Sequence, residues 1–155
     1  MINKWMIRGW MLMVACICMA SPVWACSSAV ISGKITPDGR PLLWKNRETG
    51  HLRNHMAYVN GEKYDFVANV NSDNYPAQKE AWIGYNTAGF ALMNTQSYNL
   101  VKGDVADDDR GPDNGKVMYR ALEVCATVAD FCHFLDTIQK PSGIEANFGV
   151  IDAQG

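Results

Sequence analysis

Hydrophobic and polar residues alternate in short runs between residues 26 and 100, and turn-forming residues separate the runs. Period-two alternation with β-branched residues is typical of half-buried strands. The pattern predicts three antiparallel hairpins, whose strand pairs cover residues 28–35 and 41–46, 56–59 and 64–70, and 81–85 and 90–95. Their turns contain Thr36-Pro37-Asp38-Gly39, Asn60-Gly61 and Asn86-Thr87-Ala88-Gly89.

The period changes to that of a helix from Lys116 onward. One face of a first helix carries apolar residues: Val117, Ala121, Leu122, Val124 and Cys125. Thr127 is a cap residue for a second helix over residues 128–138, and a strand follows over residues 146–151. Strands, two helices and a further strand predict an α+β fold, with helices covering a mainly antiparallel sheet.

The last four residues, Asp152 to Gly155, have the pattern of a turn. A turn without a following strand would leave a sheet edge open. We therefore expect residues 26–155 to be the N-terminal part of a single domain in a longer protein.

Residues 1–25 have the pattern of a secretory signal peptide. Lys4 and Arg8 precede an apolar run from Trp10 to Ala20, and Val23-Trp24-Ala25 ends in a small residue at the cleavage position. The apolar run has about 11 residues, fewer than the roughly 20 of a membrane-spanning helix. We expect cleavage after Ala25, no stable membrane anchor afterwards, and a periplasmic or secreted protein.

The charge of the remaining chain argues against nucleic-acid binding. Removing residues 1–25 leaves 12 basic and 16 acidic residues, a net charge of −4. Binding to nucleic acid requires a basic surface that displaces counterions. The sequence leaves open whether the chain forms a homo-oligomer.

Neither the cysteines nor the acidic residues follow a metal-binding pattern. Cys26, Cys125 and Cys132 would remain after cleavage, and the last two match no zinc spacing, so we expect both to be small buried apolar side chains. The segment from Gly103 to Gly115 has five Asp residues, but they lack the alternation of a calcium loop. We expect a solvated loop there and no metal or cofactor.

Cys26 is the strongest candidate for chemistry, because cleavage after Ala25 would make it the new N-terminus. It would then have a thiol and a free α-amine on one residue. An α-amine has a reference pKa of about 7.7 to 8.0, so its neutral fraction can take the thiol proton. Before cleavage the same nitrogen is an amide and cannot act as a base, so export would activate the protein.

Two further polar segments are expected near Cys26. Lys45-Asn46-Arg47-Glu48 ends the strand that pairs with the strand after Cys26, so a cation and a carboxylate would return beside the thiol. A surface charge cluster is the alternative interpretation. Asn94 lies in the middle of a predicted strand, where a side-chain amide could donate to an oxyanion or serve only the structure.

Three stretches together resemble the N-terminal-nucleophile hydrolases of the choloylglycine hydrolase and penicillin acyltransferase type. They are Ala25-Cys26, the GRPLLWKNRE run over residues 39–48, and the GYNTAGFALMNT run over residues 84–95. The similarity covers most of residues 26–155. It implies an αββα sandwich, incomplete here, and a hydrolase or acyltransferase for linear amides. The N-terminal Cys would attack a small-molecule amide and form an acyl-enzyme.

The resemblance also implies roles for individual residues. An Arg and an Asp three residues apart follow the nucleophile in such families, and this chain has Lys45 and Glu48 there. A Lys cannot form the two-pronged contact of an Arg, so Arg47 is the expected substitute. The resemblance therefore implies catalytic roles for Cys26, Glu48 and Asn94, and substrate binding by Lys45 and Arg47.

A lipoprotein is the main alternative from another functional class. Cys26 would then be lipidated, and the domain would be a non-catalytic binding module. Against this, Trp24 is bulky where a lipobox has a small residue, and a strand follows Cys26 without a flexible linker. Four aromatic residues could line a pocket or belong to the core and strand faces: Tyr58, Tyr64, Phe66 and Trp82.

Overall fold

The computed structural model describes residues 26–101, 103–105 and 113–154. The predicted signal peptide and most of the predicted Asp-rich loop lie outside these residues. The described part is an α+β structure with two antiparallel sheets and two helices. The predicted α+β class is therefore confirmed. Within it, no helix combines the length and apolar character needed to cross a membrane.

The first sheet is the predicted hairpin that starts next to Cys26. Strands β1 (Ser27–Ile31) and β2 (Leu42–Asn46) pair in antiparallel register, with Ser28 opposite Lys45. The predicted extension of the first strand to residue 35 is wrong. Gly33 packs so closely on the Gly39 carbonyl that a Cβ atom would lie 2.2 Å from the oxygen, so the chain already turns there.

The second sheet contains five strands in the order β3-β4-β5-β6-β7, all antiparallel to their neighbours. Their bounds are β3 Asn54–Val59, β4 Phe66–Asn71, β5 Ile83–Asn86, β6 Ala91–Gln96 and β7 Ala146–Ile151. The remaining two predicted hairpins and the last predicted strand are thus confirmed, with ends that differ by up to two residues. The loop around Asn60-Gly61 is longer than a two-residue turn, since Val59 pairs with Phe66.

Helices α2 (Asn114–Val124) and α3 (Val128–Thr137) connect β6 to β7. The Asp113 side chain caps α2 by accepting from the backbone N–H of Lys116. Thr127 caps α3 as predicted, and it forms a capping box with Asp130. The C-cap of α2 is in extended conformation, so the chain starts a separate helix instead of continuing α2.

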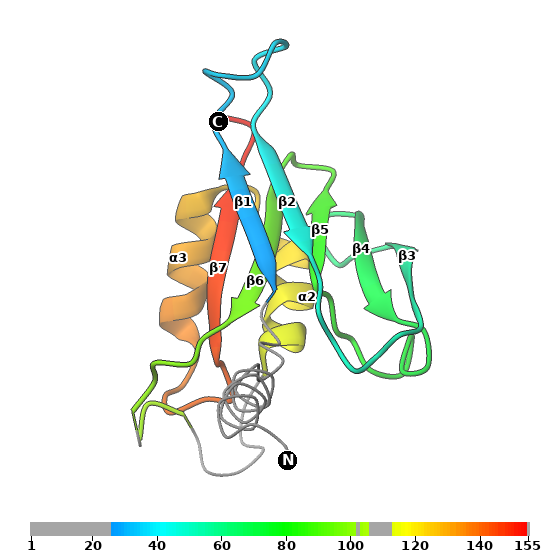
Figure 1. Ribbon diagram of the computed structural model, residues 1–155, viewed down its shortest axis with the longest axis vertical. Coiled ribbons are helices and arrows are strands. Elements are labelled where there is room, and N and C mark those ends of the chain that lie inside the picture. The colour runs from blue at the N-terminus through cyan, green and yellow to red at the C-terminus, as the bar shows by residue number, and fades with distance from the viewer. Residues whose placement is uncertain (1–25, 102, 106–112, 155) are drawn as a thin grey trace, which may run out of the picture.

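The elements form three layers, with the helices on one face of the five-stranded sheet and the β1-β2 hairpin on the other, over β6 and β7 (Figure 1). The core lies between the sheet and the helices. Its largest fully buried side chains are Phe66, Phe90, Leu92, Met118, Leu122, Val70 and Val117. At Gly149 the absence of a side chain leaves room for Val30 and Met93, so the hairpin can approach β7 closely.

The two later cysteines have different environments. Cys125 is buried, as predicted, and burial raises the pKa of its thiol to about 11. The same prediction is wrong for Cys132, whose side chain is exposed on α3. A spacing of seven residues places two side chains on one face only if a single helix contains both, and here a helix boundary at Thr127 separates them.

Candidate functional site

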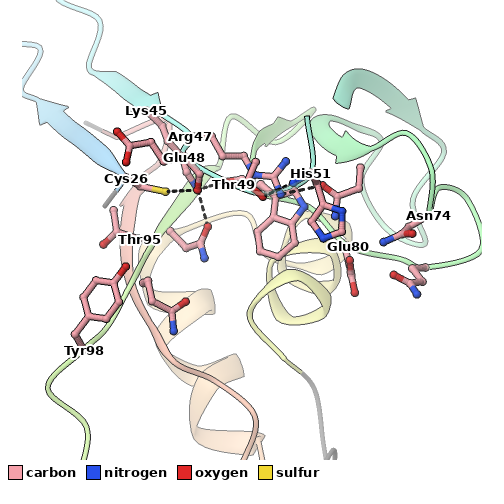
Figure 2. A pocket seen from close by; sticks show the side chains of 15 residues that line it. Cys26, Lys45, Arg47, Glu48, Thr49, His51, Asn74, Glu80, Thr95 and Tyr98 are labelled. Atoms are coloured by element: carbon pink, nitrogen blue, oxygen red, sulfur yellow. Dashed lines mark hydrogen bonds between the residues drawn. The ribbon is translucent and has the colours of Figure 1, made fainter. Parts of the chain in front are cut away.

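A cavity of about 450 Å³ opens between the hairpin, the start of β5 and the end of β6. All five residues that the sequence predicts for the site line this cavity. Figure 2 shows Cys26 and Tyr98 toward one end and Asn74 toward the other. The remaining lining residues are Lys45, Arg47, Glu48, Thr49, His51, Asn71, Gln78, Glu80, Trp82, Asn94, Thr95 and Gln96.

Cys26 immediately precedes β1, and its side chain is half-buried. The thiol donates to the backbone carbonyl of Glu48, with a sulfur–oxygen distance of 3.7 Å. This contact follows from the β1-β2 register, which pairs Ser27 with Asn46 and so brings the residues after β2 beside the residue before β1. The sequence-based expectation that the 45–48 segment returns to the thiol is confirmed.

Lys45 connects the hairpin to the five-stranded sheet. Its Nζ donates to Asn94 Oδ1 at 2.8 Å and to the backbone carbonyl of Trp82 at 2.9 Å. Burial lowers the pKa of Lys45 to about 8; the Cys26 thiolate opposes this shift and the Arg47 cation adds to it. Lys45 is therefore a half-buried amine with two neutral hydrogen-bond acceptors, not one side of a carboxylate ion pair.

Asn94 is buried in β6, and its amide orientation is set by Lys45. A protonated Lys Nζ can only donate, so the amide atom that faces it is the oxygen. The Asn94 Nδ2 is then left for another acceptor, and it donates to no residue within the described part of the chain. A positioned amide N–H₂ at a cavity wall is the kind of donor that stabilises an oxyanion.

Arg47 is held on two sides. Its Nη2 donates to Asn71 Oδ1 at 2.8 Å and its Nη1 to Asn69 Oδ1 at 3.5 Å. The guanidinium carbon lies 4.6 Å from the centre of the Trp82 ring, a cation–π contact. Burial lowers the pKa of Arg47, but an Arg remains charged in proteins. It therefore brings a fixed positive charge to the cavity wall.

Glu48 contacts the thiol through its backbone. Its carbonyl oxygen accepts the hydrogen bond from Cys26 Sγ. The side chain is exposed, and its Oε1 lies 3.5 Å from Asn46 Nδ2. Glu48 also lines the cavity.

Two polar residues that line the cavity were not predicted from the sequence. Asn71 ends β4, is buried and orients Arg47. Glu80 lies before β5, and burial together with the nearby Asp113 carboxylate raises its pKa. Neither residue has a distinctive sequence pattern. Asn71 begins a polar loop with the composition of an ordinary turn, and Glu80 lies in a loop segment without a recognisable motif.

Of the four aromatic candidates, only Trp82 lines the cavity. Phe66 belongs to the core, where its ring meets the Tyr119 ring edge to face. Tyr58 is exposed, and its hydroxyl donates to Asp65. The Tyr64 ring is near the Lys63 ammonium. The interpretation of Tyr58 and Phe66 as strand-face and core residues is confirmed.

Within the described residues, no group of three or more His, Cys, Asp or Glu side chains is arranged to hold a metal ion. Comparisons of the chain with protein-family models, with curated proteins and with solved structures give no match.

Proposed function

We propose that this chain is the N-terminal part of an exported amidohydrolase or acyltransferase of the N-terminal-nucleophile type, similar to choloylglycine hydrolase and penicillin acyltransferase. Its Cys26 thiol would attack linear, non-peptide amides of small molecules. The acyl-enzyme formed would then be released by water or by an acceptor amine. Cleavage after Ala25 would precede this activity.

The observation that carries the proposal is the hydrogen bond between Lys45 and Asn94 at the cavity that Cys26 also lines. Residues 49 positions apart in sequence meet there, one from each sheet. A nucleophile, a cation and an amide donor thus share one cavity. Acyl transfer requires such a set, because negative charge develops on the carbonyl oxygen as the thiol attacks.

The cavity fits a small-molecule substrate in size and polarity. A volume of about 450 Å³ is within the range of small-ligand sites in proteins. Asn94 Nδ2 is the donor we assign to the oxyanion, and Arg47 is the cation we assign to an anionic group of the substrate. The Glu48 carboxylate would hold the N-terminal amine or a polar group of the substrate.

The exposed face of the hairpin supports the αββα sandwich as the complete fold. Leu42 is 49% exposed and Trp44 is 53% exposed, and both alternate with half-buried residues along β2. An apolar strand face in water is unfavourable, and a second helix layer would cover it. We propose that later residues of the longer protein supply this layer.

Intact mass and amidase assays of the exported full-length protein test the proposal. We expect a chain that begins at unmodified Cys26, and activity that is lost in Cys26→Ala and in a variant with one residue inserted before Cys26. Cys132→Ala is the matched control, because this exposed thiol is on α3, and it should be fully active.

Two results would reject the proposal. A mass increase from a diacylglyceryl group on Cys26 would show a lipoprotein instead. Amide hydrolysis that persists in a folded Cys26→Ala variant would show that the thiol is not the nucleophile. Circular dichroism of each variant separates loss of activity from loss of fold.

A further inference from the structure

A second, smaller cavity of about 220 Å³ lies between β1 and the β6-β7 pair, and we call it the β1 groove. The hairpin lies across these two strands, with β1 over β7 (Figure 1). The lining residues form three runs, one from each strand: 28–30, 93–95 and 147–149. The proposed reaction at Cys26 requires room for the acyl part of an amide, and the groove is a candidate for it.

The missing side chain of Gly149 leaves apolar surface in the groove. A Cβ atom at Gly149 would lie 2.6 Å from Met93 Cε and 3.2 Å from Val30 Cγ2, so both apolar side chains border this space. Met93 is buried, whereas Val30 is 55% exposed and therefore lies at the open edge of the groove. Ser28 and Val30 share one face of β1, because side chains alternate along a strand. The groove thus follows β1 from Ser28 to an apolar end at Val30.

The β1 groove adjoins the larger cavity at the thiol end. Asn94 and Thr95 line both cavities, and Cys26 lines the larger one. Figure 2 shows Thr95 toward the Cys26 end of the larger cavity, with His51 further toward the opposite end. Ser28 follows Cys26 by two residues, which is about 7 Å along a strand. A chain attached to the sulfur is therefore close to the start of the groove.

The two cavities differ in charge. The larger cavity has several ionisable side chains, including Lys45, Arg47 and Glu80. Among the described residues that line the β1 groove there is no Asp, Glu, Lys, Arg or His, and Val30 and Met93 contribute apolar surface. A charged group loses hydration in an uncharged groove without gaining a partner, whereas a hydrocarbon chain does not. The groove therefore favours the uncharged part of a substrate, and the larger cavity favours the charged part.

We propose that the β1 groove binds the acyl chain of the substrate, while the amine part carries an anionic group to Arg47. This inference rests on the proposed function, and it names the substrate class as N-acyl amino acids with an uncharged acyl chain of medium length. With the carbonyl carbon at Cys26 and its oxygen at Asn94 Nδ2, the two substituents of the carbonyl lead into the two cavities.

The volume of the groove indicates the length of the chain. About 220 Å³ accommodates about seven water-sized groups of about 30 Å³ each, which equals the seven carbons beyond the carbonyl of an octanoyl chain. With carbon–carbon bonds of about 1.5 Å, an extended octanoyl chain is about 9 Å long. Such a chain passes Ser28 and ends toward Val30. An acetyl group does not reach the groove.

Val30→Phe in the processed full-length enzyme narrows the groove at its open edge. Because Val30 is 55% exposed, the larger ring can be accommodated without moving the core. The probes are N-acylglycines with acetyl, butanoyl, octanoyl and decanoyl chains, and the 4-nitrophenyl esters of the same acids, which have no amine part. N-octylacetamide carries a long chain on the amine side instead.

We expect unmodified enzyme to prefer octanoyl over acetyl by about tenfold or more in kcat/KM, because methylene groups bind favourably in an apolar groove. Val30→Phe should lower kcat/KM for octanoyl and decanoyl substrates by about tenfold or more, for acylglycines and esters alike. Acetyl and butanoyl substrates should keep their unmodified values, which also shows that the variant folds. Val30→Ala widens the groove and should favour decanoyl over octanoyl. Ile35→Phe is the matched control, since Ile35 is exposed on the same hairpin and lines neither cavity.

A chain-length profile that both Val30 variants leave unchanged would overturn the inference, and so would an equal loss for all chain lengths in Val30→Phe. A loss confined to N-octylacetamide would also overturn it, because the amine part would then occupy the groove. The proposed function fails separately, if unmodified enzyme hydrolyses no amide of the panel or if Cys26→Ala retains activity. Even without amide hydrolysis, intact mass would follow acylation of Cys26 by the esters, and its dependence on chain length would still test the groove.

Discussion

Lys45 Nζ and Asn94 Oδ1 lie 2.8 Å apart and join the β1-β2 hairpin to the five-stranded sheet. The contact has two consequences for the cavity. It orients the Asn94 amide so that Nδ2 faces away from Lys45, and it holds Lys45 near Cys26 without a neutralising carboxylate. One hydrogen bond therefore positions both the proposed oxyanion donor, Asn94 Nδ2, and the Lys45 amine.

Replacing Asn94 should impair catalysis more than stability. Asn94→Ala removes the Nδ2 donor, and loss of a single oxyanion donor lowers kcat by about 100- to 1,000-fold. Asn94→Asp should be at least as inactive, because a carboxylate would repel the oxyanion. Steady-state kinetics with an acylglycine measure the effect.

Asn147→Ala is the matched control for Asn94. Asn147 is an exposed residue of β7, one register position from the residue opposite Asn94. Its replacement should leave kcat within experimental error. Equal losses in the two variants would contradict a specific role for Asn94 and would indicate a general effect on the sheet.

Arg47→Lys should weaken substrate binding while leaving the chemical step largely intact. A Lys cannot donate to Asn71 and Asn69 and also stack on Trp82, so its charge would no longer be fixed at the cavity wall. We expect KM for an anionic acylglycine to rise by about tenfold, the scale of one lost charge-assisted contact. Unchanged KM would reject Arg47 as the anion-binding residue.

Arg53→Lys is the corresponding control, since Arg53 is exposed and forms an ion pair with Asp73. An exposed ion pair contributes about 1 kcal/mol or less, and this one is formed by residues that do not line the cavity. Both kinetic constants should remain at their unmodified values. A similar KM change in both variants would point to the net charge of the protein instead of the contact.

The sequence predicts the strands well because both the period and the turns are local properties. The sequence-based prediction fails where contacts between distant residues determine the end of a strand or the exposure of a side chain. The strand after Cys26 is shorter than predicted, since the chain turns where Gly33 packs on Gly39. The start of the second helix at Thr127 is predicted, but the exposure of Cys132 on that helix is not.

In the candidate site, too, the contacts set by local pairing are predictable and those set by long-range packing are not. Cys26 and the charged segment after β2 could be placed together from the register of one hairpin. The contact between Lys45 and Asn94 depends on how that hairpin sits across β6, which no local pattern encodes. Asn71 is likewise a site residue only because β4 ends beside Arg47.

Gly84→Ala should destabilise the sheet. A Cβ atom at Gly84 would lie 2.6 Å from the backbone oxygen of Val67 and 2.8 Å from Leu122 Cδ1, so β5 would have to move away from β4 or α2. Overpacking of this kind costs about 1 to 3 kcal/mol. Chemical denaturation of the full-length protein measures it. Gly50→Ala, with no neighbouring atom within 4 Å, should change stability little.

Asn86→Ala should also cost stability, through lost hydrogen bonds. The buried Asn86 Nδ2 donates to the carbonyls of Leu122 and Cys125 at the end of α2, and Oδ1 accepts from the backbone of Ala88 and Phe90. The substitution leaves these groups buried without partners, a loss of about 2 to 4 kcal/mol. Asn60→Ala in an exposed loop is the control; equal stability of the two variants would contradict this role.

The lowered pKa of Lys45 predicts how stability changes with pH. Lys45 has a pKa of about 8 in the folded chain and near 10.5 when unfolded. Between these values the unfolded state binds more protons, so this residue's contribution to the free energy of unfolding rises with pH and is complete above the unfolded pKa. Below pH 8 both states are protonated, and burial of the charge opposes folding.

Lys45→Met isolates this contribution, because Met keeps the side-chain length without a titrating group. Urea unfolding of the full-length protein and of Lys45→Met should show a stability difference that is constant below about pH 7 and then moves in favour of the Lys protein up to about pH 11. Titrating groups that do not interact with Lys45 cancel in the difference, whereas Cys26, whose charge interacts with Lys45, contributes to it. A difference independent of pH would mean that Lys45 keeps its ordinary pKa in the folded protein.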